Sequence, residues 1–134
     1  MAGYLDMIGG DLVAWRGYRL PLTPISVCQG EYIAATIAVP EALALNDIKA
    51  FLGFYTKGPI IVFCDNQTAV SLADSNASTK RMRHISTRIA FLREQVNDGT
   101  IMMYHISTTG QLADIFTKAL PPATFHKLRA LLIN

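Results

Sequence analysis

The sequence has little cysteine and little charge. Only two of its 134 residues are cysteine, and charged residues make up 16% against 51% hydrophobic residues. Cys28 and Cys64 lie far apart and lack metal-motif spacing, which excludes a disulfide scaffold and a zinc finger and indicates reduced thiols in an intracellular protein. The apolar surroundings of Cys64 favour an inert, buried thiol. This composition also argues against intrinsic disorder.

The sequence contains no long hydrophobic run. Its most apolar stretch, from Tyr32 to Leu45, is interrupted by Pro40 and Glu41 and is too short to span a membrane. No basic region followed by an apolar segment is present at the N-terminus, so we expect no secretory signal. The length fits a single intracellular domain over residues 1–134, with no membrane partner.

The net charge of +2 is too small to indicate a nucleic-acid partner by itself. The basic residues are unevenly distributed, however, and no acidic residue lies among those between positions 76 and 93. These residues are Lys80, Arg81, Arg83, Arg88 and Arg93. One interpretation is a solvated loop and helix surface, and the other is a strip that follows a phosphate backbone.

Strand patterns occur near the N-terminus, in the middle of the chain and just after residue 99. Gly3 to Ile8 and Leu12 to Tyr18 read as short strands, and Gly9-Gly10 between them predicts a hairpin. Ile60 to Cys64 is a continuous apolar run between turn residues, which predicts a strand buried on both faces. Thr100 to Ile106 is expected to form a further strand.

Helical patterns separate these strands. Ser26 resembles an N-cap at the start of a long helix that runs to about Leu52, and Pro40 inside it predicts a kink or a division. Thr108 and Gln111 form a second capping-box pattern before another helix. The remaining helices are expected near residues 67–73, 85–96, 108–119 and 125–132. Strands alternating with helices indicate an α/β layer fold.

Three acidic residues have unusual positions. Asp65 directly follows the central apolar strand, Glu31 lies in the first turn of the long helix, and Asp114 lies in the first turns of the helix opened by Thr108. A helix N-terminus stabilises a carboxylate, so each residue alone has a structural explanation. Together, beside a basic strip, they have the chemistry that Mg²⁺-dependent phosphoryl transfer requires. Spacing alone does not determine whether they converge.

Several segments resemble the ribonuclease H domain of copia-type LTR retrotransposon Pol polyproteins. Cys64 to Ala69 is similar to the family motif "CDNQSA", and Gln111 to Lys118, followed by Leu120-Pro121, is similar to "QLADIFTKPLP". The remaining matches are Arg83 to Arg88 with "KHIDIR", Gln29 to Tyr32 with "EAEY", and Gly3-Tyr4 with Trp15 to a hairpin "SGY…SW". The resemblance covers nearly the whole chain.

This resemblance implies a ribonuclease H-like α/β fold, a mixed sheet flanked by helices. It also implies a four-carboxylate site for two Mg²⁺ or Mn²⁺ ions, in which Glu31, Asp65 and Asp114 are the catalytic residues and metal ligands. The implied reaction is hydrolysis of the RNA strand of an RNA–DNA hybrid during reverse transcription, beside a reverse transcriptase domain upstream in the polyprotein. In this context the basic strip is predicted to bind nucleic acid, through Lys80, Arg81, Arg83, His84 and Arg88. A capping or solvent-facing role is the alternative for His84.

The chain departs from the family at its N-terminus. The family's first catalytic aspartate lies on a strand just upstream of "SGY", whereas this sequence starts with Met1-Ala2-Gly3. That strand is central in the family's sheet, so we expect the first strand and one carboxylate to be missing. An alternative function follows: a catalytically inactive or domesticated remnant that binds nucleic acid or a protein partner.

Overall fold

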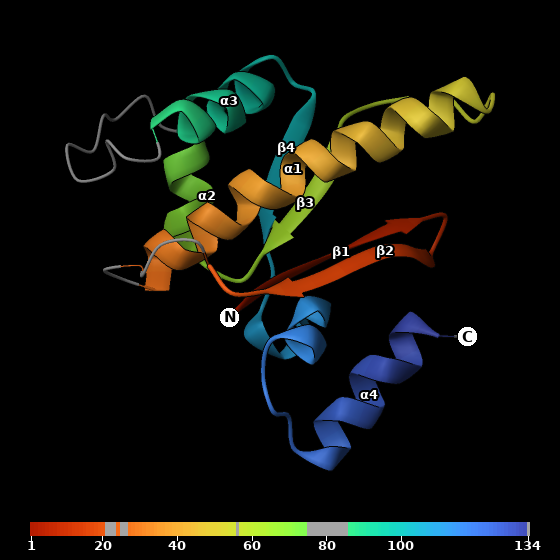
Figure 1. The fold of residues 1–134 in the computed structure, drawn as a ribbon, viewed down its shortest axis with the longest axis vertical. Coiled ribbons are helices and arrows are strands. Elements are labelled where there is room, and N and C mark those ends of the chain that lie inside the picture. The colour runs from red at the N-terminus through yellow and green to blue at the C-terminus, as the bar shows by residue number, and fades with distance from the viewer. Residues whose placement is uncertain (21–23, 25–26, 56, 75–85, 134) are drawn as a thin grey trace.

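The chain begins with the predicted hairpin. In the computed structural model, which describes residues 1–20, 24, 27–55, 57–74 and 86–133, β1 (Ala2–Ile8) pairs antiparallel with β2 (Asp11–Tyr18) (Figure 1). Gly9 and Gly10 form the turn with φ values of 64° and 97°, which glycine adopts without strain. The register shifts between Asp6 and Met7, which marks a bulge in β1.

The long helix is present and Pro40 does not divide it. α1 (Val27–Phe51) is one continuous helix with Pro40 inside it. Its buried residues all lie before this proline, and the helix ends at an exposed Phe51. Packing of the N-terminal half therefore outweighs the loss of one backbone hydrogen bond at Pro40. The predicted N-cap Ser26 lies outside the described residues.

A parallel pair of strands forms the second sheet. β3 (Ile60–Cys64) lies in register with β4 (Ile101–His105), and α2 (Gln67–Asp74) and α3 (Ser86–Asn97) connect them. The prediction that β3 is buried on both faces is wrong. Alternate side chains, Ile61 and Phe63, are 45% and 57% exposed, because no described element covers that face.

The core lies between this sheet and the three α-helices that pack on its other face. α1 contacts β3, α2 and α3, while α2 and α3 also contact β4. The largest side chains of the cluster are fully buried and come from different elements: Tyr32, Ile33, Val39, Leu92 and Ile101. The helix predicted near residues 85–96 is confirmed, and it has an apolar stripe on which Ile89 and Leu92 are buried and Val96 packs against the core.

The segment after β4 differs from the prediction. Two short 3₁₀ helices, η2 (Thr108–Gly110) and η3 (Leu112–Phe116), replace the α-helix expected from Thr108. Gln111 between them is extended, with φ −73° and ψ 101°, and its side-chain oxygen accepts a hydrogen bond from the backbone N–H of Ala113 instead of completing a capping box. Threonine and glycine, both weak helix formers, precede it and do not favour a longer helix.

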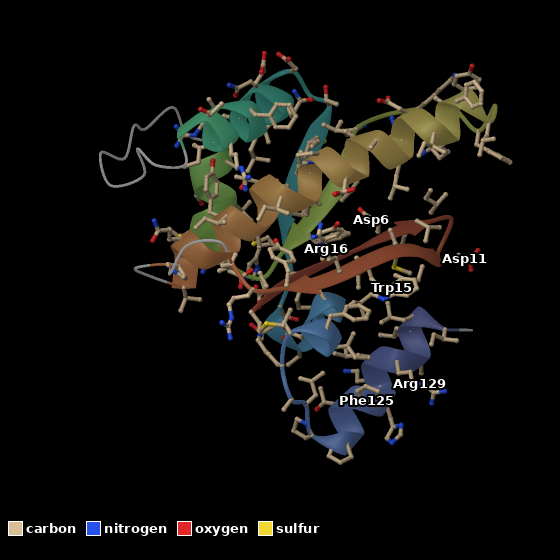
Figure 2. The ribbon with its side chains drawn as sticks, viewed as in Figure 1. Asp6, Asp11, Trp15, Arg16, Phe125 and Arg129 are labelled. Carbon is tan, nitrogen blue, oxygen red and sulfur yellow. The ribbon has the colours of Figure 1, made fainter. Side chains whose placement is uncertain are left out.

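The C-terminal helix covers the hairpin on the side away from α1. α4 (Pro122–Leu132) is confirmed as an amphipathic helix with buried Leu128 and Leu132, and it packs against η3. Figure 2 shows Trp15 on this side of the hairpin, where its ring stacks on Phe116 at 6.5 Å. A Cβ atom on Gly17 would lie 2.7 Å from the carbonyl oxygen of Phe116, so this contact requires glycine.

The described strands form two separate two-stranded sheets. The mixed α/β class is confirmed, but no hydrogen-bonded strand in the described ranges joins the hairpin to β3, so a single mixed sheet is not formed. α1 instead contacts both β1 and β3 and holds the sheets together (Figure 1). Of the helices described, none is long and apolar enough to cross a membrane.

Candidate metal centre

Two of the predicted carboxylates meet where α1 passes the end of β3. Glu31 lies in the second turn of α1, and Asp65 is the first residue after β3. The next residue holds the backbone in place, because the side-chain oxygen of Asn66 accepts a hydrogen bond of 3.0 Å from the backbone N–H of Ala69 in α2. The side-chain donor atoms of Glu31, Cys64 and Asp65 all lie within 4.8 Å of one another.

The third carboxylate comes from a different part of the fold. Asp114 is buried in η3, and its Oδ1 accepts a 2.8 Å hydrogen bond from Nζ of Lys118, with which it also forms an ion pair. Asp114 is not within the 4.8 Å cluster. Its charge nevertheless acts on Glu31, which places it at the edge of the same centre.

The electrostatics show that these groups share one environment. Burial raises the pKa of Glu31, and the negative charges of Asp65 and then Asp114 raise it further, while Lys118 opposes them. The hydrogen bond to Asp114 raises the pKa of Lys118, and the charges of Asp65 and Glu31 act in the same direction. The structure thus brings Glu31 and Asp65 together, while Asp114 and Lys118 lie outside the 4.8 Å cluster and act on Glu31 through their charges.

A cleft of about 330 Å³ opens beside this centre. Glu31 and Gly30 of α1 form one part of its wall, and Arg19 and Leu20 after β2 form another. A positive side chain near a carboxylate cluster suits a phosphate that lies between them. The cleft therefore places one cationic side chain, Arg19, in the same wall as the Glu31 carboxylate.

The predicted nucleic-acid residues are mostly outside the described part of the chain. Of this set, the described residues include only Arg88. The others lie outside them: Lys80, Arg81, Arg83 and His84. Arg88 is exposed in the first turn of α3. Its positive charge acts on the hydroxyl of Tyr18, as does the negative charge of Glu31.

Sequence reasoning missed two members of the centre. Lys118 could have been found from its position four residues after Asp114, a spacing that favours ion pairs. Cys64 was interpreted as an inert thiol. It is buried as predicted, but its sulfur points toward Glu31 and Asp65 because the chain turns immediately after β3.

The chain is similar over almost its whole length to parts of much longer proteins. It is 32% identical over 129 residues to the "Retrovirus-related Pol polyprotein from transposon TNT 1-94" of Nicotiana tabacum, covering 96% of this chain and 10% of that protein. The chain is homologous to a segment of retrotransposon Pol polyproteins. The Pol polyprotein from transposon RE2 of Arabidopsis thaliana is 29% identical over 124 residues, with 92% of this chain and 8% of that protein covered.

Yeast contains related polyproteins too. The transposon Ty1-NL2 Gag-Pol polyprotein of Saccharomyces cerevisiae is 29% identical over 129 residues, which cover 94% of this chain and 7% of that protein. The chain thus spans about a tenth or less of the length of these Pol relatives. No family model and no solved structure matches it.

Proposed function

We propose that the chain is the ribonuclease H segment of a retrotransposon Pol polyprotein, and that it hydrolyses the RNA strand of RNA–DNA hybrids during reverse transcription. The observation that carries this proposal is the convergence of Glu31 and Asp65, with donor atoms within 4.8 Å and the charge of Asp114 acting on Glu31. Homology to Pol polyproteins and the order of the "CDNQ" and "QLADIFTK" segments support it.

The carboxylates fit divalent cations. Glu31 and Asp65 supply the oxygen donors that Mg²⁺ or Mn²⁺ prefers, and their mutual repulsion, reflected in the raised pKa of Glu31, would be relieved by a cation. Asp114 is the third carboxylate of the proposed two-ion centre. When bound, such ions lower the pKa of a coordinated water and stabilise negative charge on the phosphate.

The chain's own residues would position the substrate. Arg19 shares the cleft with Glu31, and the exposed Arg88 on α3 adds a second positive charge, both suited to the phosphates of a hybrid. Lys118 orients Asp114 through the 2.8 Å hydrogen bond that its Nζ donates to Oδ1. The 2′-hydroxyl groups are the feature by which an RNA strand would be selected over DNA.

The test is Mg²⁺-dependent cleavage of an RNA–DNA hybrid labelled on the RNA strand. Asp65→Asn keeps the shape of the side chain but removes a charged ligand, so we expect cleavage to fall at least about a hundredfold. Asp98→Asn, at an exposed position after α3, is the matched control and should cleave normally. Circular dichroism and hybrid binding establish that both variants are folded.

Two outcomes would contradict the proposal. Equal cleavage by the wild-type chain and Asp65→Asn would show that the activity does not come from this centre. Hybrid binding without cleavage by the wild-type chain, at any Mg²⁺ or Mn²⁺ concentration, would instead support the alternative of an inactive remnant that binds nucleic acid.

A further inference from the structure

The thiol of Cys64 lies inside the carboxylate cluster. Cys64 is the last residue of β3 and is only 5% exposed, yet its Sγ is within 4.8 Å of a carboxylate oxygen from both Glu31 and Asp65. Its one described hydrogen bond is a weak contact of 3.9 Å to the backbone oxygen of Asn66. The buried Cys64 sulfur, with only this weak hydrogen bond described, thus lies beside the carboxylate oxygens of Glu31 and Asp65.

Sulfur changes which cations suit this cluster. Mg²⁺ selects oxygen donors, whereas Zn²⁺ and Cd²⁺ bind thiolates strongly and accept carboxylates beside them. Bond lengths of about 2.3 Å for Zn–S and about 2.0–2.2 Å for Zn–O put tetrahedral donors about 3.5 Å apart. Donor atoms already within 4.8 Å of one another reach this spacing by small side-chain rotations.

We propose that Glu31, Cys64 and Asp65 form a binding site for one thiophilic divalent cation, of which Zn²⁺ and Cd²⁺ are examples. On binding, the S–H bond of Cys64 breaks, a sulfur–metal bond forms, and the proton leaves to solvent. The three anionic ligands then exceed the charge of the cation by one, and the nearby Lys118 ammonium group partly balances this excess. The fourth coordination position is available to water.

The site shares two carboxylates with the proposed Mg²⁺ centre. A thiophilic cation and Mg²⁺ would therefore exclude each other, so that Zn²⁺ acts as an inhibitor. Only this consequence rests on the proposed function. The ligand set of the thiophilic site rests on the distances and the burial alone.

The experiment is a titration of the purified chain with Cd²⁺, followed by the sulfur-to-metal charge-transfer absorbance in the ultraviolet. The wild-type chain should develop this band with one Cd²⁺ per chain, and Cys64→Ser should lose it. Cys28→Ser is the matched control, because Cys28 is the other free thiol and lies one turn before Glu31 on α1. This control should keep the band. Glu31→Gln and Asp65→Asn should each weaken Cd²⁺ binding by about tenfold or more.

Several results would overturn the proposal. If the band survives in Cys64→Ser, or disappears in Cys28→Ser, Cys64 is not the sulfur ligand of the bound cation. X-ray absorption of the Zn²⁺-loaded wild-type chain needs no variant to fold, and it should find one sulfur with oxygen ligands. Zero or two sulfur ligands would contradict the site.

Competition between Cd²⁺ and Mg²⁺ for the chain tests the thiophilic site and the Mg²⁺ centre separately. If excess Mg²⁺ weakens Cd²⁺ binding, both cations use the shared carboxylates. If Cd²⁺ binds through one sulfur but excess Mg²⁺ leaves the titration unchanged, the thiophilic site stands and the Mg²⁺ centre does not.

Discussion

Ionisation of Asp6 opposes folding, and replacement by asparagine should remove this effect. Asp6 lies on β1, on the side of the hairpin that faces α1 (Figure 2). Burial, followed by the negative charge of Glu41, raises its pKa from 3.8 to about 6. Within the described residues its Oδ2 atom is buried and has no hydrogen-bond partner, so nothing compensates its charge.

The size of the effect follows from this pKa. A rise of about two units corresponds to about 3 kcal/mol for a fully buried group, and solvent screening of the half-buried Asp6 reduces it to about 1–1.5 kcal/mol. Because the pKa is higher in the folded state, the penalty is absent well below about pH 4 and grows as the pH rises through about 6. Asp6→Asn should therefore stabilise the fold by about 1–1.5 kcal/mol near pH 7.5 and by about half as much near pH 5.

Urea unfolding followed by circular dichroism at both pH values measures this difference. Asp11→Asn is the control, since Asp11 is exposed on the same hairpin and should change little at either pH. Glu41→Gln should stabilise in the same direction but by less, because the charge of Glu41 is the smaller of the two causes. A loss of stability in Asp6→Asn near pH 7.5, or the same gain at both pH values, would refute the reasoning.

Two further predictions concern packing and nucleic-acid binding. Leu128→Ala should destabilise the fold by about 2–5 kcal/mol in urea unfolding, because Leu128 is buried where α4 packs, whereas Leu131→Ala on the exposed face of the same helix should change little. Equal effects would show that α4 does not pack through Leu128. Arg88→Gln should reduce the salt dependence of RNA–DNA hybrid binding by about one unit in the slope of log K against log salt, and Arg129→Gln on α4 should leave it unchanged. An unaltered slope in Arg88→Gln would exclude a phosphate contact there.

Local chemistry made part of the fold predictable. The Gly9-Gly10 turn, the apolar run of β3 and the stripe on α3 each depend on neighbouring residues, and all three elements formed where the sequence indicated. The extent of burial was not predictable in the same way. An apolar run shows that a strand favours burial, but whether anything covers Ile61 and Phe63 depends on elements distant in the sequence.

The continuity of α1 through Pro40 and the 3₁₀ helices after Thr108 have the same origin. Proline weakens a helix locally, but the packing of α1 on β3 and α2 depends on the assembled core. The capping box at Thr108 and Gln111 predicted an α-helix, yet tertiary contacts of η3 with β1 favour two short 3₁₀ helices. The candidate site follows this pattern. The sequence indicated Glu31, Asp65 and Asp114 as candidates, but the position of Cys64 beside Glu31 and Asp65 depends on how β3 packs against α1.

The separation of the two sheets has a mechanical consequence for the carboxylates. Glu31 and Asp65 belong to the layer of α1, α2, α3 and the β3–β4 sheet. Asp114 lies in η3, which packs against β1 of the hairpin and against α4. Because no hydrogen-bonded strand in the described ranges spans these two parts, the contacts of α1 with β1 and with β3 hold them together. A ligand bound by all three carboxylates would therefore add a further connection between these two parts of the fold.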